Sequence, residues 1–152
     1  MGYKEEKQHQ LDMRYLRMAR IWAENSYCVR RKVGALIVKD KMIISDGYNG
    51  TPSGFENVCE DGEGHTKPYV LHAEANAIIS ASRRDMVGST LYLVGRDAQT
   101  GALLGDATSC AMCRRQVINA GISRVIIRRT ETEFQVVDVN DWVHQEDDVP
   151  AL

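Results

Sequence analysis

The ten residues from Tyr69 to Ile78, YVLHAEANAI, place a histidine and a glutamate two positions apart in an otherwise apolar, alanine-rich run. The run continues to Arg84 and ends in two arginines, which predicts a helix, because alanine favours helices and basic side chains stabilise a helix C-terminus. Burying two polar groups in such a run costs free energy unless each has a partner. His72 and Glu74 are therefore candidate functional residues.

The segments on either side of this helix predict strands. Residues 33–38 and 42–46 are separated by the polar KDK and form a predicted hairpin, and residues 89–95, 123–129 and 134–139 are further β-rich runs. The last two are joined by TETE alone, which is too short for a parallel crossover, so they should pair antiparallel.

Two more helices are predicted outside the strands. One covers residues 11–26, where Leu11, Tyr15, Met18 and Trp22 form an apolar stripe, and the other covers residues 108–122, with Gly121 as its stop signal. The order of elements predicts an α/β fold, with about five strands and helices on both faces of the sheet. Between the hairpin and the HAE helix, residues 49–68 are rich in turn-forming residues. A loop this long is interpreted as part of a functional site.

Composition limits the classes of protein to which the chain can belong. Its 152 residues, 43% hydrophobic and 26% charged, suit a single domain over 1–152, with a core of about 10–140 and an acidic C-terminal tail. A net charge of -2 argues against a long nucleic acid as partner. The start resembles no secretion signal and no apolar run is long enough to cross a bilayer, so we expect a cytoplasmic protein with no membrane partner and with reduced cysteines.

Two of the four cysteines form a C-x-x-C pair, Cys110 and Cys113, at the predicted start of a helix. Alone, such a pair fits a structural, a redox or a metal-binding role. Together with His72 it supplies one nitrogen and two sulfurs for tetrahedral Zn²⁺, and three protein ligands leave the open position that catalytic zinc requires. Glu74 then lies near the metal as a proton shuttle.

The HAE and CAMC motifs together resemble those of the zinc-dependent nucleobase deaminases. The stretches VGALIV, GYNGTPSG, PYVLHAEANAI and INAGISRVII extend the resemblance over roughly residues 10 to 129, and are most similar to the deoxycytidylate (dCMP) deaminase branch of the cytidine/deoxycytidylate deaminase family. The resemblance implies a cytidine deaminase-like three-layer α/β/α sandwich with a mixed five-stranded sheet.

The resemblance also implies roles for individual residues. His72, Cys110 and Cys113 match the zinc ligands, and Glu74 matches the residue that moves a proton from water to the substrate. The remaining matches concern the substrate. Asn49 in GYNG matches a residue that holds the sugar, Arg30 matches a position that meets the 5′-phosphate, and Tyr69 and Ala73 complete the candidate substrate-binding residues.

The implied reaction is zinc-dependent hydrolysis of dCMP to dUMP and ammonia, a step of pyrimidine deoxynucleotide metabolism. The resemblance also implies a homo-oligomer and, as candidate effectors, dCTP and dTTP. Two alternatives stay open. One is a zinc-dependent deaminase of another small nucleotide, nucleoside or base, and the other is a non-catalytic zinc-binding protein of the same fold.

The sequence departs from the family pattern near the second motif. Ser109 stands where the family usually has proline, and an insertion at residues 96–107 separates the preceding strand from Cys110. This insertion borders the predicted site and is a candidate cause of altered substrate choice. Cys28 and Cys59 are interpreted as ordinary buried or loop thiols. Cys59 and His65 alone do not make a second zinc site, because a structural site needs four ligands.

The remaining basic residues near these motifs have a simpler interpretation, as solvated charges. They are Arg31, Lys32, Arg114 and Arg115.

Overall fold

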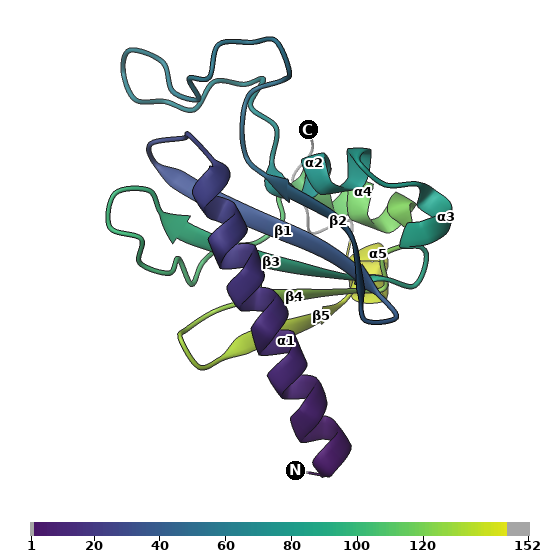
Figure 1. The fold of residues 1–152 in the computed structure, drawn as a ribbon. Coiled ribbons are helices and arrows are strands. Elements are labelled where there is room, and N and C mark those ends of the chain that lie inside the picture. The colour runs from purple at the N-terminus through teal and green to yellow at the C-terminus, as the bar shows by residue number, and fades with distance from the viewer. Residues whose placement is uncertain (1, 146–152) are drawn as a thin grey trace.

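The computed structural model describes residues 2–145 and shows a five-stranded sheet with the strand order β2-β1-β3-β4-β5 (Figure 1). The strands are β1 (Arg31–Lys39), β2 (Met42–Tyr48), β3 (Thr90–Asp97), β4 (Arg124–Arg128) and β5 (Phe134–Asp138). β3 and β4 are parallel, and the other neighbouring strands are antiparallel, including the final β4–β5 pair. The predicted mixed sheet is confirmed.

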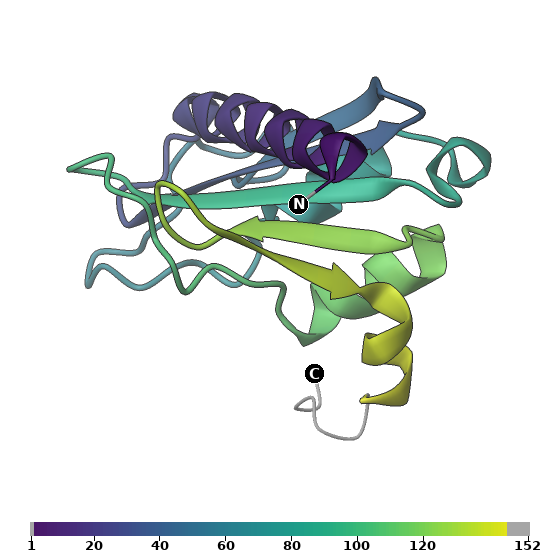
Figure 2. The same cartoon turned by 90° about the horizontal axis from the view of Figure 1, so that it is seen from below.

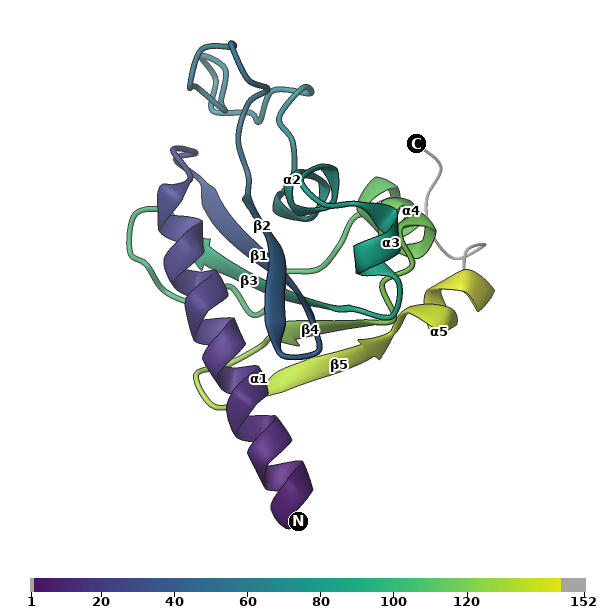
Figure 3. The same ribbon diagram turned by 45° about the vertical axis from the view of Figure 1, so that its right-hand side comes forward.

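Helices cover both faces of the sheet. α1 (Tyr3–Trp22) lies on one face, and α2 (Ala73–Ile79) and α4 (Ala111–Ala120) lie on the other (Figures 1 and 2). The short elements are η1 (Ala23–Asn25), α3 (Arg83–Met86) and α5 (Val139–His144). Figure 3 shows the same three layers from the side of α3 and α5. The α/β/α sandwich is therefore confirmed.

Alternating residues of β1 and β3 supply two cores, one for each face of the sheet. Leu36 and Tyr92 belong to the core beneath α1, whereas Ala35 and Leu93 belong to the core beneath α2 and α4. Because both faces of these central strands are covered, they are apolar along almost their whole length. This explains why they were visible in the sequence as uninterrupted apolar runs.

The buried face of α1 differs from the predicted stripe. Tyr15 is buried as expected, but Met18 and Trp22 are 44% and 38% exposed, and the indole of Trp22 instead donates to Asp46 Oδ1 at 2.9 Å. The small residue Ala19 lies where the helix approaches β1 most closely. A Cβ added to Gly34 would lie 1.9 Å from the carbonyl oxygen of Ala19. The helix thus packs through Ala19 as well as through the larger Tyr15 and Leu16, and a stripe of large residues does not indicate the contact of Ala19.

The predicted helix over residues 69–84 is divided into two. α2 begins only at Ala73, with His72 as an extended N-cap residue, and α3 follows after a break at residues 80–82. The long loop before it leaves the sheet at β2 and returns through a bridge between Gly50 and Leu71. This loop projects at the top of Figure 1.

The C-terminal segment docks on the body of the protein as far as the described residues extend. Trp142 of α5 is 4% exposed, and the Arg114 guanidinium lies 5.1 Å from the centre of its ring. Most of the predicted acidic tail falls on residues 146–152, outside the described residues. Within residues 2–145, the helices are too short or too polar to span a membrane.

Candidate active site

The candidate site is a pocket of about 350 Å³ on the face of the sheet that carries α2 and α4. It lies where the N-termini of these two helices approach the central strands β1 and β3. Its lining includes Arg30, Arg31, Val33, Asn49, Glu60, His72, Ala73, Glu74, Leu93, Gly95, Leu104, Ala107 and Cys110. The pocket thus brings together residues from most of the chain.

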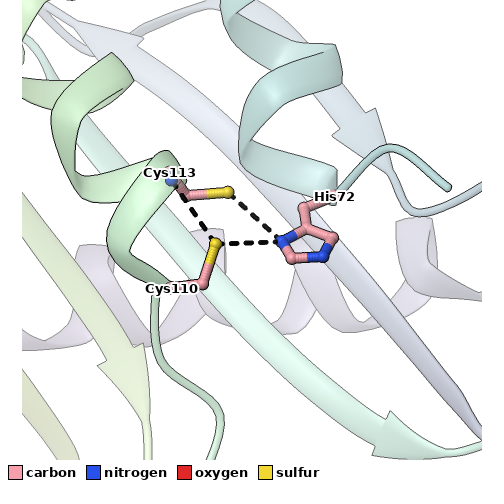
Figure 4. A group of neighbouring side chains, drawn as sticks. All are labelled: His72, Cys110 and Cys113. Carbon is pink, nitrogen blue, oxygen red and sulfur yellow. Dashed lines mark hydrogen bonds between the residues drawn. The ribbon is translucent and has the colours of Figure 1, made fainter. Parts of the chain in front are cut away.

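His72 and Cys110, which line this pocket, meet the buried Cys113 (Figure 4). Nδ1 of His72 lies 3.4 Å from the sulfur of Cys110 and 3.3 Å from that of Cys113. His72 caps α2 and Cys110 caps α4, where its sulfur accepts the backbone N–H of Cys113 at 3.4 Å. These potential ligand atoms lie within 4.8 Å of one another and could hold one metal ion.

The two sulfurs have different surroundings. Cys110 is exposed toward the pocket and Cys113 is buried. Burial, and then the nearby Glu74 carboxylate, raise the pKa of the Cys113 thiol above its usual range. A thiol in such a place stays neutral unless a cation stabilises its thiolate, which is the form that binds metals. The chemistry of this donor set therefore fits a divalent metal ion such as zinc.

Glu74 is 3% exposed and lines the same pocket from the first turn of α2. The side chain of Glu74 is buried beside Cys113. His72, whose ring is exposed, directly precedes the helix as its N-cap residue. The residue between them, Ala73, is fully buried and also lines the pocket. The carboxylate is consequently close to the metal-binding group and open to a bound molecule.

Asn49 lines the pocket, but both ends of its side-chain amide are bonded to β1. Its Oδ1 accepts the backbone N–H of Val33 at 2.8 Å, and its Nδ2 donates to the carbonyl of Arg31 at 2.9 Å. These bonds fix the loop after β2 to the edge of the pocket. One N–H and one lone pair of the amide remain for a ligand.

Arg30 also lines the pocket. Its backbone is held by the carboxylate of Glu60, a residue that the sequence analysis did not identify. Glu60 is 8% exposed, and its Oε1 accepts the backbone N–H groups of Val29 and Arg30 at 3.0 and 3.4 Å. Its position within the long loop gave no signal of this contact. Tyr69, by contrast, lies outside the pocket lining and packs on Phe55, with ring centres 5.0 Å apart.

Cys28 and Cys59 are not free thiols, which corrects the expectation from sequence. They form a disulfide that joins the segment before β1 to the long loop. The two residues are 31 positions apart, and only the fold brings them together. His65 is not in this group. The side chain gathered with the two sulfurs is Glu60, whereas His65 lies beside the exposed Asp61 and Glu63.

Arg31 is not simply a solvated charge either. Its Nη2 donates to Asp106 Oδ2 at 2.8 Å, which links β1 to the insertion predicted at residues 96–107. Arg114, another residue expected to be solvated, donates to the carbonyl of Ser109 and covers Trp142. The insertion itself lines the pocket through Leu104 and Ala107, so the expectation that it borders the site is confirmed.

The fold and this group of side chains are those of a metal-dependent deaminase, and comparison with known proteins identifies the family. The model of the cytidine and deoxycytidylate deaminase zinc-binding region matches residues 9–129. The chain belongs to this family.

Individual relatives agree with this assignment. The deoxycytidylate deaminase of Mycobacterium phage D29 is 32% identical over 129 residues, covering 76% of this chain and 91% of the phage protein. That of Saccharomyces cerevisiae is 34% identical over 140 residues, covering 83% of this chain but 41% of the yeast protein. The chain thus spans nearly the whole of the phage relative and about two fifths of the yeast relative.

A solved structure shows the same arrangement of elements. The dCMP deaminase of cyanophage S-TIM5, crystallised in complex with dCMP and dUMP, matches with a TM-score of 0.65 at 30% identity. The match covers 96% of this chain and 94% of the cyanophage chain. The cytidine deaminase-like fold is therefore confirmed over almost the whole length.

Proposed function

We propose that this protein is a dCMP deaminase, which hydrolyses dCMP to dUMP and ammonia. The observation that carries the proposal is the meeting of His72, Cys110 and Cys113 beside the buried carboxylate of Glu74, at a pocket that His72, Glu74 and Cys110 line. The phage and yeast relatives named above support the choice of dCMP among the substrates that a deaminase of this fold could take.

In this proposal, His72, Cys110 and Cys113 hold one zinc ion. Three protein ligands leave one position open, and zinc in such a site lowers the pKa of bound water to about 7. The disposition of the ligands supports this role, because both helix N-termini point their capping residues toward one spot. The partial positive charge of a helix N-terminus favours the thiolate form of cysteine.

Glu74 moves the proton. A carboxylate that is buried next to the reacting group can carry a proton from water to the ring nitrogen, and can then carry a second proton from the newly added hydroxyl group to the leaving amine. Its position on the first turn of a helix fixes its backbone, and its surroundings exclude bulk water. The preceding residue, Ala73, also lines the pocket and adds a small apolar side chain there.

The other end of the pocket binds the sugar and the phosphate. Arg30 lines the pocket and is placed by Glu60, and a guanidinium can grip a phosphate through two parallel hydrogen bonds. Asn49 contributes its remaining N–H and lone pair toward the sugar. Arg31 also lines the pocket, where its guanidinium is paired with Asp106.

The proposal extends to the assembly and the setting of the enzyme. The proposal keeps the cytoplasmic location expected from the sequence, and the resemblance to deoxycytidylate deaminases supports a homo-oligomer with dCTP and dTTP as effectors. Exposed apolar side chains on two helices, Ile21 of α1 and Ile79 of α2, are 62% and 71% exposed and would be covered in an oligomer. Light scattering after gel filtration, with and without each effector, tests both points.

A substrate panel tests the activity. Zinc-loaded protein is incubated in parallel with dCMP, CMP, deoxycytidine and cytosine, and the deaminated products are separated by chromatography. The proposal predicts rapid formation of dUMP and much slower reaction of the other three. Turnover of another member of the panel in preference to dCMP would replace the proposal with deamination of that compound.

A further inference from the structure

The inserted segment, defined here as residues 98–108, forms a wall of the pocket. We infer that Leu104 in this wall is a specificity-determining residue, which favours 2′-deoxyribose over ribose. This inference rests on the proposed function, because it concerns the sugar of a pyrimidine nucleotide bound in the same pocket.

The inserted segment lies beside the last part of β3, which does not pair with β4. β4 pairs with β3 only as far as Leu93. Beyond that point Leu104 donates its backbone N–H to the carbonyl of Gly95 at 2.9 Å, and Leu103 forms an antiparallel bridge with Arg96. The segment is the green loop beyond the arrowhead of β3 in Figure 1. It thus extends the sheet along the pocket.

Three arginines from other parts of the fold anchor the inserted segment. Arg20 donates to the carbonyl of Gly101 at 3.0 Å, and Arg31 is paired with Asp106. Arg129 donates to the carbonyls of Gly105 and Ala107 at 2.8 and 2.6 Å. Contacts from α1, β1 and the β4–β5 turn together hold the segment in one position, which a specificity element needs.

The segment approaches the strand closely because residue 95 is glycine. A Cβ at Gly95 would lie 2.9 Å from Cβ of Ala107 and 3.6 Å from Cβ of Leu104. The absence of a side chain there lets both apolar residues reach the pocket lining. Gly95 therefore sets the depth at which Leu104 stands in the pocket.

The register of β1 and β3 places Leu104 at the middle of the pocket. Three cross-strand pairs point to the pocket face, and successive pairs are about 6.7 Å apart along the strands. They are Ala35 with Leu93, Val33 with Gly95, and Arg31 with Asp97. The first pair lies near the metal-binding group, because Ala73, next to His72, belongs to the same core cluster as Leu93. Leu104 lies at the level of the second pair, because its backbone is bonded to Gly95.

A nucleotide with its reacting ring near Glu74 and its phosphate near Arg30, which directly precedes β1, would place its sugar at the level of Val33 and Gly95. There it meets the isobutyl group of Leu104 and the methyl group of Ala107, neither of which can form a hydrogen bond. A ribose 2′-hydroxyl turned toward this wall would lose water without gaining a partner, whereas the CH₂ of deoxyribose would not. An apolar pocket of this kind disfavours an added hydroxyl by roughly 10- to 100-fold.

The test compares Leu104→Asn with the apolar control Leu104→Met in the full-length, zinc-loaded protein. Asparagine has a similar length but offers a donor and an acceptor, whereas methionine conserves the volume and remains apolar. For each protein, kcat/KM is measured for dCMP and for CMP, and the dissociation constants of dUMP and UMP are measured by calorimetry. We expect Leu104→Asn to lower both the dCMP/CMP and the UMP/dUMP ratios roughly 10-fold or more, and Leu104→Met to keep them.

Unchanged ratios in a folded Leu104→Asn protein would overturn the inference. A wild-type protein that deaminates neither nucleotide would contradict the proposed function, but the two product dissociation constants would still decide the role of Leu104. If Leu104→Asn lowers the melting temperature so far that the protein is unfolded in the assay, Leu104→Thr takes its place with the same criteria.

Discussion

The sulfur of Cys113 lies 3.3 Å from Nδ1 of His72, although the two residues are 41 positions apart in the chain. The sulfur is buried and the pKa of its thiol is raised, first by burial and then by Glu74. Without a cation, folding would bury a neutral thiol against a carboxylate and an imidazole. With zinc bound, all of these polar groups have a partner, so the metal should contribute to folding as well as to activity.

Cys113→Ala should therefore abolish zinc binding. The expected metal content falls from about one zinc ion per chain to near zero, because two ligands do not make a site. Inductively coupled plasma mass spectrometry after dialysis measures it. Met112→Ala, a change at the exposed neighbouring residue, is the matched control and should keep its zinc. Retention of one zinc ion by Cys113→Ala would remove this residue from the metal site.

Arg30→Ala should weaken the binding of nucleotides but not of nucleosides. Loss of a charge-assisted contact with phosphate raises the KM for dCMP by roughly 10- to 100-fold and leaves that for deoxycytidine almost unchanged. Lys32→Ala is the matched control, because it removes the same charge from a residue between Arg31 and Val33; these two line the pocket, so the alternation of β1 turns Lys32 to the other face of the sheet. Equal changes in both KM values for Arg30→Ala would argue against a phosphate contact.

The Arg31–Asp106 pair should be visible in the titration of the Asp106 carboxyl. The Arg31 guanidinium, through its hydrogen bond and its charge, lowers the pKa of Asp106 below its usual range. The stabilisation that this pair provides is thus present above the pKa of the unfolded chain and is lost as the pH falls through the lower, folded-state pKa. Carbon-13 NMR should show the pKa of Asp106 returning toward its ordinary value in Arg31→Ala, and an unchanged titration would mean that the pair does not persist in solution.

The Cys28–Cys59 disulfide should be detectable by counting thiols. Protein purified without reductant and then denatured with a chelator present should titrate as two thiols, from Cys110 and Cys113. Cys28→Ser is the control and should titrate as three thiols or form a mixed disulfide. Reduction of the native protein should lower the free energy of unfolding by roughly 2–4 kcal/mol. A count of four thiols in the unreduced protein would show that the disulfide does not form.

Much of the fold could be predicted because the elements carry strong local signals. The apolar runs of β1 and β3 are buried on both faces, and the short TETE link allowed only an antiparallel β4–β5 pair. Helix α1 was less predictable at the level of side chains. Its contact surface includes Ala19 against Gly34 beside the larger Tyr15 and Leu16, and small residues contribute little to a pattern of hydrophobicity.

The metal-binding group was also predictable, because His72, Glu74 and the C-x-x-C pair each occupy a helix start that the sequence marks. The contacts that shape the rest of the pocket depend on distant parts of the chain. Glu60 bonds the backbone of Arg30 from 30 residues away, and Asp106 meets Arg31 across 75 positions. A local sequence pattern cannot reveal such pairs, because they form only when the long loop and the inserted segment fold against β1.

The most direct test of the account is ammonia release from dCMP by zinc-loaded wild-type protein and by zinc-loaded Glu74→Gln side by side. Glutamine has the shape of glutamate but cannot accept the proton, so turnover should fall by roughly 10²- to 10⁴-fold while the zinc content stays at one per chain. Fast release by the wild type and near-silence of the variant, at equal zinc content, is the predicted result. Equal rates for the two proteins, or loss of zinc from Glu74→Gln, would contradict the assignment of metal binding to His72, Cys110 and Cys113 and of proton transfer to Glu74.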